Sequence, residues 1–435
     1  MIDGKDLYKE AKFTGVDSVR QAQTILLRKH LLYAKEHSPA YRNILAEIDS
    51  NFELKQIPLL PFTEKKDIEN NPESFLAVPR AQIADIALSS GTTGKPIQIF
   101  YTGNDLKRLA YNEEQAFAGC EIGAGDIALL TCTMDRCFVA GLAYYLGMRA
   151  RGATVIRNGH GVIESHAELI GSLKPTVIVG VPTFLKKLGL AMEQWGQRPA
   201  ESGIKKLVCI GEPLRDKNFG LSCVGRDIER IWHAKVFSTY ASSETITTFC
   251  ECSAQRGGHL IPELAVIEIV DDQGIVLPPG EMGEIVLTPM SVEGMPLIRY
   301  KTGDISFLET SPCSCGRFTP RLGPILGRKK QLMKVKGTSL YPQTIFLALE
   351  DIPGVSNYFI EVLTECELSD RLIVHVAVND ASLDHEKLQE LLGAKLRVKP
   401  EIVIEKEAAI KSKVFMPGAR KPVRFFDGRI VYVEA

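Results

Sequence analysis

One short segment of this chain combines the side chains that bind a polyphosphate: Ser89, Ser90, Gly91, Thr92, Thr93, Gly94, Lys95 and Pro96. Hydroxyl groups and the backbone N–H groups that glycine leaves accessible can surround phosphate oxygens, and a lysine ammonium adds positive charge. The spacing excludes a Walker P-loop, which has four residues between its glycines and a Ser or Thr directly after the lysine. A flexible surface loop of this composition is the alternative, so the rest of the chain must supply the partners of a nucleotide.

Further segments carry groups that a bound nucleotide needs. Glu244 ends the segment Tyr-Ala-Ser-Ser-Glu after an apolar run, where a carboxylate can hold Mg²⁺ against phosphates. Asp304 could accept hydrogen bonds from both ribose hydroxyls, and Arg328 could bind ribose or phosphate. Lys421 lies in a polar, glycine-containing loop suited to a mobile cation. Each residue alone is also typical of a turn or a solvated surface, so the argument rests on the set and its order.

The elements that must position these groups form a regular alternation of apolar runs and longer segments after residue 128. Short apolar runs at 128–132, 153–156, 176–181, 206–210 and 235–240 are separated by helix-length segments. Runs without alternation suit strands buried on both faces of a parallel sheet, and their spacing fits βαβ units. Because open α/β sheets bind ligands at the carboxyl ends of their strands, we expect the chemistry at residues 181–182, 211–212 and 240–244.

The remaining segments indicate a change of architecture along the chain. Residues 264–270 and 283–287 read as antiparallel strands. Residues 17–49 carry a helical pattern that is broken at Ser38-Pro39 and resumes near Tyr41. Thr63 is expected to cap a helix that starts at Glu64. Strands at 355–362, 371–378 and 401–405, with a helix at 384–397, make a compact α+β piece. We therefore expect an α/β protein. Its large N-terminal domain, residues 1–328, has mixed and parallel sheets flanked by helices plus a small β-subdomain, and residues 329–435 form a small α+β C-terminal domain.

The composition is that of a soluble globular protein, and we expect it to have no nucleic-acid or membrane partner. The chain has 435 residues, 45% of them hydrophobic and 24% charged, and its net charge of −1 gives no overall attraction to nucleic acid or an anionic membrane. No apolar run approaches the roughly 18 residues of a membrane-spanning helix. The N-terminus lacks the basic-then-apolar pattern of a signal peptide, so we expect a cytoplasmic protein.

Cysteines gather at two places in the sequence. Cys252 and His259, followed later by Cys313 and Cys315, offer three thiolates and an imidazole, which is a ligand set that tetrahedral zinc prefers. Cys250 could replace one of these ligands. Reduced cysteines without a metal are the alternative, and the spacing alone leaves both open. Four protein ligands leave no open position, so a catalytic zinc is not expected.

Taken in order, these motifs resemble the phenylacetate–coenzyme A ligases of the adenylate-forming acyl-CoA synthetase superfamily. Besides the phosphate loop, the resemblance includes Ser38–Arg42, Leu60–Thr63, Phe75–Arg80, Lys174–Ile178, Gly211–Leu214, Met295–Tyr300 and Cys313–Arg317, and it weakens after residue 345. It implies that a carboxylic acid, such as phenylacetate or a related aryl acid, reacts with Mg-ATP to give an acyl-adenylate and pyrophosphate. Coenzyme A then displaces AMP. It also implies a C-terminal domain that rotates between the two steps, and it suggests a homodimer.

The resemblance assigns roles by position. It gives the β- and γ-phosphates to the loop residues Ser89, Ser90, Thr92, Thr93 and Lys95, with Gly91 and Gly94 between them. It gives magnesium to Glu244, the α-phosphate to Ser243, the adenine to Glu212, Pro213 and Tyr240, and the ribose to Asp304 and Arg328. Lys421 would bridge the substrate carboxylate and the α-phosphate, Lys330 would be the hinge, and Lys336 and Gly337 would line the pantetheine path. Phe138 and Ala241 belong to the acid pocket, and the recurrence of Cys252, His259, Cys313 and Cys315 in these ligases favours a structural zinc.

The chain also departs from that family's pattern. Lys330 stands where aspartate is usual, and Ala241 and Arg420 stand where glycine is usual. The segment 134–141 replaces an aromatic- and glycine-rich acid pocket, so the acid itself stays open. Two other functions remain as alternatives. The adenylate could pass to an amine or a carrier protein, or the chain could be a nucleotide-binding regulator with degenerate chemistry.

Overall fold

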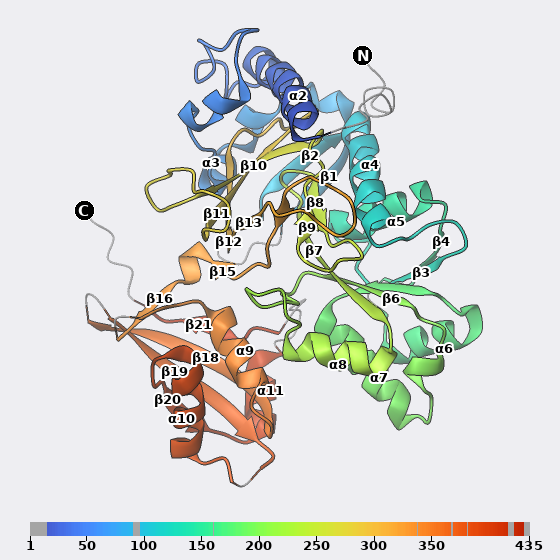
Figure 1. Cartoon of the computed structure of the whole chain (residues 1–435), viewed down its shortest axis with the longest axis vertical. Coiled ribbons are helices and arrows are strands. Elements are labelled where there is room, and N and C mark those ends of the chain that lie inside the picture. Colours follow the sequence, from blue (N-terminus) through green and yellow to red (C-terminus); the bar gives the residue numbers. More distant parts are fainter. Residues whose placement is uncertain are drawn as a thin grey trace. The chain divides into compact units, whose positions relative to one another are not determined.

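The computed structural model describes residues 15–89, 96–159, 161–336, 338–366, 369–380, 382–415 and 422–429 (Figure 1). The chain divides into two compact units: the first is Met1–Thr302 with Ser306–Ile325, and the second is Gly303–Ile305 with Leu326–Ala435. The functional division into residues 1–328 and a mobile 329–435 stays a prediction. Within the described ranges, none of the helices is both long enough and apolar enough to cross a membrane.

A six-stranded sheet is the centre of the first unit. Its strands are β3 (Ile127–Leu130), β4 (Thr154–Arg157), β5 (Val177–Gly180), β6 (Lys206–Ile210), β7 (Lys235–Ser242) and β8 (Thr247–Cys250), in the order β4-β3-β5-β6-β7-β8. All neighbours pair in parallel except β7 and β8, which are antiparallel. The predicted parallel strands are therefore confirmed.

Helices cover both faces of this sheet, which explains why its strands are apolar without alternation. The covering helices are α4 (Gly103–Gly119), α5 (Val139–Ala150), α6 (Ile163–Leu173), α7 (Pro182–Gln194) and α8 (Cys223–Trp232). Val179 and Val208 pack into the cluster that contains residues of α4 and α5, whereas Ile178 and Leu207 pack into the cluster of α6, α7 and α8. In Figure 1, α7 and α8 lie side by side next to β6, in agreement with their close packing.

The N-terminal part of this unit begins with the long helix α2 (Val16–His37), which confirms the first part of the predicted helical pattern. The predicted resumption near Tyr41 is wrong, because residues 39–47 form turns after the break at Ser38-Pro39. It continues through α3 (Lys65–Asn70), the short 3₁₀ turns Leu54–Leu59, Pro72–Phe75 and Arg80–Gln82, and the antiparallel pair β1 (Ile83–Leu88) and β2 (Gln98–Thr102). The predicted cap of α3 is wrong, because Glu64 occupies the N-cap position. Thr63 instead bonds the Tyr41 hydroxyl at 2.6 Å and donates to the carbonyl of Ile298 at 2.7 Å, so long-range packing decides its role.

Antiparallel strands complete the first unit, and the sequence predicts two of them, at 264–270 and 283–287. They are β9 (Gly258–His259), β10 (Ala265–Val270), β11 (Gly283–Pro289), β12 (Tyr300–Ser306), β13 (Leu308–Glu309) and β14 (Arg321–Leu322), with one further 3₁₀ turn at Pro199–Glu201. β10 pairs antiparallel with β11, and β14 joins β13 to β9 in a small separate sheet. The second unit begins within β12, where Asp304 and Ile305 pair with the next strand.

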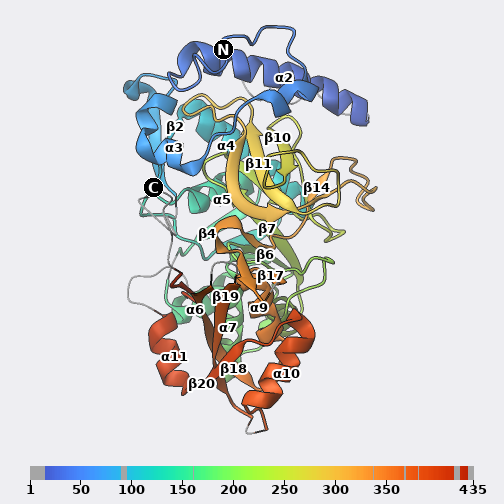
Figure 2. The same ribbon diagram turned by 90° about the vertical axis from the view of Figure 1, so that its left-hand side faces the viewer.

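The second unit is a four-stranded sheet with helices on both faces. Its elements are β15 (Gly327–Arg328), the 3₁₀ turn Lys329–Gln331, β16 (Met333–Val335), β17 (Thr338–Leu340), α9 (Pro342–Glu350), β18 (Val355–Cys366), β19 (Ser369–Val378), α10 (His385–Leu396), β20 (Glu401–Ile404), α11 (Glu407–Val414) and β21 (Phe425–Asp427). The sheet order is β20-β19-β18-β21. Ile360 on β18 packs toward α9 and α10, and its neighbour Phe359 packs toward α11, so the alternation along β18 separates two cores. Figure 2 shows α10 and α11 on opposite sides of the sheet.

Candidate active site

The candidate phosphate loop connects β1 to β2, and its two ends are fixed by hydrogen bonds. The Ser89 N–H donates to the Ile97 carbonyl at 3.0 Å, and the Ile97 N–H donates to the Ser89 hydroxyl at 3.1 Å. Ser90, Gly91, Thr92, Thr93, Gly94 and Lys95 lie outside the described residues. The Ser89 hydroxyl oxygen thus already accepts a hydrogen bond at the base of the loop. Its hydroxyl hydrogen is still available to donate to a phosphate oxygen, which is the contact predicted for Ser89.

The strand that follows this loop holds the predicted magnesium-binding segment. The Tyr101 hydroxyl on β2 donates to the Ser243 carbonyl at 2.8 Å. Burial, aided by the nearby charge of Glu244, raises the pKa of Tyr101 well above its ordinary value, so the phenol remains a donor. The Ser242 hydroxyl donates to one oxygen of the Glu244 carboxylate at 3.1 Å, and no hydrogen bond from another described residue reaches the second oxygen. Residues far apart in sequence therefore meet at the carboxyl end of β7.

The loop after β6 begins with a glycine that the backbone requires. Gly211 has φ of +72°, a left-handed conformation that residues with a side chain rarely adopt. The Glu212 carboxylate accepts hydrogen bonds from the Thr183 N–H at 3.1 Å and the Thr183 hydroxyl at 2.8 Å. Glu212 thereby joins the end of β6 to the first turn of α7. With its carboxylate used in this way, the backbone around Pro213 is the better candidate to frame an adenine.

The predicted acid-pocket residues come from two loops of the first unit. Phe138 precedes α5 at its N-cap position, and the backbone carbonyl of the adjacent Cys137 accepts a hydrogen bond from the Leu88 N–H at 2.8 Å. This bond ties the loop before α5 to the end of β1, where the phosphate loop begins. Ala241 lies at the end of β7, opposite Thr248 on β8, and is exposed. Their roles in acid recognition stay predictions.

The candidate metal ligands converge although they come from separate loops. The ligand atoms of Cys252, His259, Cys313 and Cys315 all lie within 4.8 Å of one another. The Cys252 and Cys313 sulfurs are 3.6 Å apart, and the Cys315 sulfur is 3.4 Å from His259 Nε2. Zinc bonds of about 2.3 Å to sulfur and 2.0 Å to nitrogen place tetrahedral ligand atoms about 3.5–3.8 Å apart. The donor set and its spacing fit zinc.

The surroundings of the cluster fix the form of the histidine. His259 Nδ1 lies 3.0 Å from the Thr319 hydroxyl, which leaves Nε2 facing the cysteines. Burial, followed by the charges of Arg317 and Arg321, lowers the pKa of His259 to about 4, so the imidazole is neutral. Thr319 is a residue that the sequence analysis missed, since a threonine four positions after Cys315 carries no recognisable signal. The alternative ligand Cys250 lies outside the cluster, because its sulfur contacts the Cys120 sulfur at 3.2 Å.

The second unit contains the predicted ribose residues as neighbours. Asp304 and Arg328 face each other in the pairing of β12 with β15, and Arg328 Nε lies 3.3 Å from an Asp304 carboxylate oxygen. Lys330 is exposed, and its carbonyl accepts a hydrogen bond from Arg429 at 3.3 Å. Lys336 has φ of +46° in the hairpin turn between β16 and β17, while Gly337 and Lys421 lie outside the described residues.

A surface pocket of about 390 Å³ lies elsewhere in the first unit. Lys217, Phe219, Arg256 and Phe307 are among its lining residues, and none of the predicted nucleotide, acid or metal residues lines it. Its cavity therefore gives no support to the predicted active site.

The described residues define an α/β fold in which Ser243 and Glu244 follow β7 at its carboxyl end, the edge where open α/β sheets usually bind their ligands. The family model described as "AMP-binding enzyme" matches residues 18–292, and the chain belongs to this family. It is 33% identical to a phenylacetate–coenzyme A ligase of Thermus thermophilus over 79% of this chain and 78% of that protein. It is also 28% identical to the Escherichia coli phenylacetate–coenzyme A ligase over 95% of this chain and 96% of the relative.

A solved structure shares the fold. The crystal structure of 2-hydroxyisobutyryl-CoA ligase in the postadenylation state, in complex with 2-HIB-AMP, aligns with a TM-score of 0.84 at 20% identity. The alignment covers 98% of this chain and 94% of that one.

Proposed function

We propose that this protein is an ATP-dependent carboxylic acid:CoA ligase, and that its acid is an aryl acid such as phenylacetate or a relative. The observation that carries the proposal is the match to phenylacetate–coenzyme A ligases over most of both chains, together with family membership. The placement of Ser243 and Glu244 beside the strand that follows the phosphate loop supports it. The proposal extends to a homodimer, as in the family it resembles.

In the first step, a carboxylate oxygen of the acid attacks the α-phosphorus of ATP, and the bond to the bridging oxygen breaks to release pyrophosphate. The loop Ser89–Lys95 would hold the β- and γ-phosphates, and Ser243 would contact the α-phosphate. Glu244 would hold Mg²⁺, which supplies positive charge against the phosphates when bound. The Glu244 oxygen that accepts no hydrogen bond from the described part of the chain fits this role.

In the second step, the coenzyme A sulfur attacks the acyl carbonyl carbon, AMP leaves, and the thiol proton passes to solvent. Asp304 and Arg328 would bind the ribose. The Asp304 carboxylate would then accept hydrogen bonds from the ribose hydroxyls in place of part of its contact with Arg328. Lys421 would stabilise charge in the first step only, and Lys336 with Gly337 would line the pantetheine path in the second. Lys330 would be the hinge between the two arrangements.

A panel of aryl acids with ATP, Mg²⁺ and coenzyme A tests the function. We expect AMP and a thioester to form in equal amounts with at least one acid. If no acid in a broad panel yields AMP, the ligase proposal fails. Acid-dependent pyrophosphate exchange without any thioester would instead favour transfer of the acyl group to an amine or a carrier protein.

The Lys421→Ala variant tests the assignment of the catalytic lysine. It should abolish adenylate formation while sparing thioester formation from a supplied acyl-adenylate, because the lysine acts on the first step. Arg420→Ala is the matched control and should retain both half-reactions. Loss of adenylation in Arg420→Ala with retention in Lys421→Ala would show that the neighbouring residue carries the role.

We also propose that Cys252, His259, Cys313 and Cys315 bind a structural zinc ion. The purified protein should contain about one equivalent of zinc, and Cys315→Ser should lower this content. Cys250→Ser is the control, because its sulfur packs against Cys120 and should not affect zinc binding. Zinc content below about half an equivalent in a freshly purified sample would contradict the proposal.

A further inference from the structure

A buried ion pair fixes the turn that follows the candidate adenine loop. Arg215 Nε donates to one oxygen of Glu251 at 2.6 Å, and Arg215 Nη2 donates to the other at 3.0 Å. The exposed fractions of the two side chains are 6% and 2%. Arg215 stands two positions after Pro213, so the pair anchors the chain directly beyond the loop that we assign to the adenine.

The remaining polar groups of the pair are also used. Arg215 donates to the carbonyls of Phe219 and Val236, each at 3.2 Å, and Glu251 accepts from the Ser238 N–H at 2.8 Å. The pair thus joins the turn after β6 to β7 and to the chain end of β8. A buried ion pair whose other hydrogen bonds are all made holds its two side chains in a single geometry. Removal of one partner would leave the other charge buried and unpaired. The turn is therefore held rigidly by Glu251.

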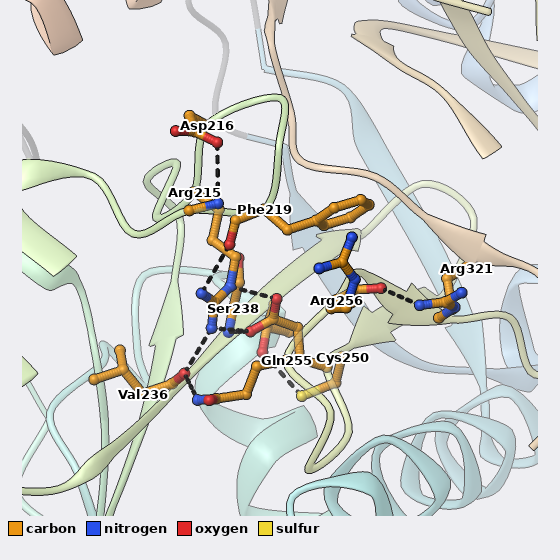
Figure 3. Close-up of polar contacts among 12 residues, drawn as sticks. Arg215, Asp216, Phe219, Val236, Ser238, Cys250, Gln255, Arg256 and Arg321 are labelled. Atoms are coloured by element: carbon orange, nitrogen blue, oxygen red, sulfur yellow. Dashed lines mark hydrogen bonds and ion pairs between the residues drawn. The ribbon is translucent and has the colours of Figure 1, made fainter. Parts of the chain in front are cut away.

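The same network continues into the metal cluster. Glu251 is the direct chain neighbour of the cluster residue Cys252. The Gln255 N–H donates to the Cys252 carbonyl at 2.9 Å, and the Gln255 side chain donates to the Val236 carbonyl at 2.7 Å. Figure 3 shows that Arg215 and Gln255 converge on this one carbonyl. A change in the position of Cys252 must therefore move either Glu251 or the contact at Val236.

We propose that Arg215 and Glu251 are positioning residues that couple the metal cluster to the nucleotide loop, so that zinc bound at Cys252 supports ATP affinity. This inference rests on the proposed function, because it takes Gly211–Pro213 as the adenine loop. The pair does not touch ATP, and its effect acts through the backbone of residues 211–215. Zinc would thus serve nucleotide binding in addition to local folding.

Glu251→Gln is the test, and ATP binding is measured by calorimetry without acid or coenzyme A, alongside steady-state kinetics. We expect the Kd and KM for ATP to rise about tenfold, with a smaller change in kcat. Losses of this size are typical when a residue that orients a ligand-binding group, without touching the ligand itself, is replaced. Arg215→Lys keeps the charge but loses the two-pronged contact, and it should give an intermediate rise. If Glu251→Gln does not fold, Arg215→Lys carries the test alone.

Glu268→Gln is the matched control. Glu268 pairs with Arg299 in the same two-pronged way, at 2.9 and 3.0 Å, and both side chains are buried. This variant should lose stability to a similar degree but leave the KM for ATP unchanged. An equal rise of the KM in Glu268→Gln would show that the effect is general destabilisation, and it would overturn the proposal.

Zinc removal completes the experiment. Chelation of zinc should weaken ATP binding to the wild type, as measured by calorimetry. It should add little to the loss of ATP affinity in Glu251→Gln, because both changes act through the same contacts between the metal cluster and the adenine loop. Fully additive losses, or unchanged ATP affinity in a zinc-free wild type that remains folded, would overturn the coupling. Failure of the proposed function appears differently: the wild type itself would then yield no AMP with any acid.

Discussion

We predict that replacing Glu113 by glutamine removes a large part of the pH dependence of stability of the first unit. Glu113 lies on α4 and is 1% exposed. One carboxylate oxygen accepts hydrogen bonds from the Thr248 hydroxyl and from the Asn112 amide, while the other has no partner among the described residues. Burial raises the pKa of Glu113 to about 7, and the bonds from Thr248 and Asn112 lower it only in part.

The direction and size of the effect follow from proton linkage. The folded protein binds a proton at Glu113 more tightly than the unfolded chain does, so the contribution of this carboxyl to stability is fully present below pH 4.5 and is lost as the pH rises through 7. Between pH 5 and pH 8 this carboxyl should lower the free energy of unfolding by about 2–3 kcal/mol. The side chain is fully buried, so solvent does not screen the effect.

Urea unfolding followed by tryptophan fluorescence measures this prediction. The two tryptophans of the chain, Trp195 and Trp232, both belong to the first unit, so the signal reports the part that contains Glu113. The wild type should lose about 2–3 kcal/mol more than Glu113→Gln between pH 5 and pH 8. Glu114→Gln, at the neighbouring and less buried position, should keep the wild-type slope. Parallel pH profiles for the wild type and Glu113→Gln would refute the reasoning.

Two further variants test the geometry of the site, and a third tests a buried carboxylate of the first unit. Tyr101→Phe removes the bond to the Ser243 carbonyl and should cost about 1 kcal/mol of unfolding free energy, with a lower rate of pyrophosphate exchange. A normal exchange rate would separate Tyr101 from the site. Gly211→Ala forces a side chain into the left-handed conformation, so urea unfolding should show a loss of about 1–2 kcal/mol and calorimetry should show weaker ATP binding. Asp105→Asn disturbs a buried carboxylate that accepts from three backbone N–H groups, and the urea midpoint should reveal a loss of about 2 kcal/mol. An unchanged urea midpoint would show that these three hydrogen bonds to Asp105 contribute little to stability.

Much of the fold could be predicted because local pattern and burial agree along the chain. The apolar runs that become β3, β5 and β6 have no alternation, since helices cover both faces of their sheet. The cap at Thr63 could not be predicted, because its hydroxyl bonds groups that are distant in sequence. β21 was not predicted either, since a three-residue strand carries too little pattern and exists through pairing with β18.

The sequence by itself determined the chemical inventory: a candidate phosphate loop whose spacing is not that of a Walker motif, a carboxylate at Glu244, and a zinc-type donor set in two loops. Short-range order is enough for this, because the types and local spacing of these residues limit what they can bind. Only the tertiary structure decided which donors meet. It brought Cys252 to Cys313 and excluded Cys250, turned Glu212 toward Thr183, and joined Arg215 to Glu251. Such contacts depend on packing between distant segments, and a lone charged residue carries no local sign of the partner it will have.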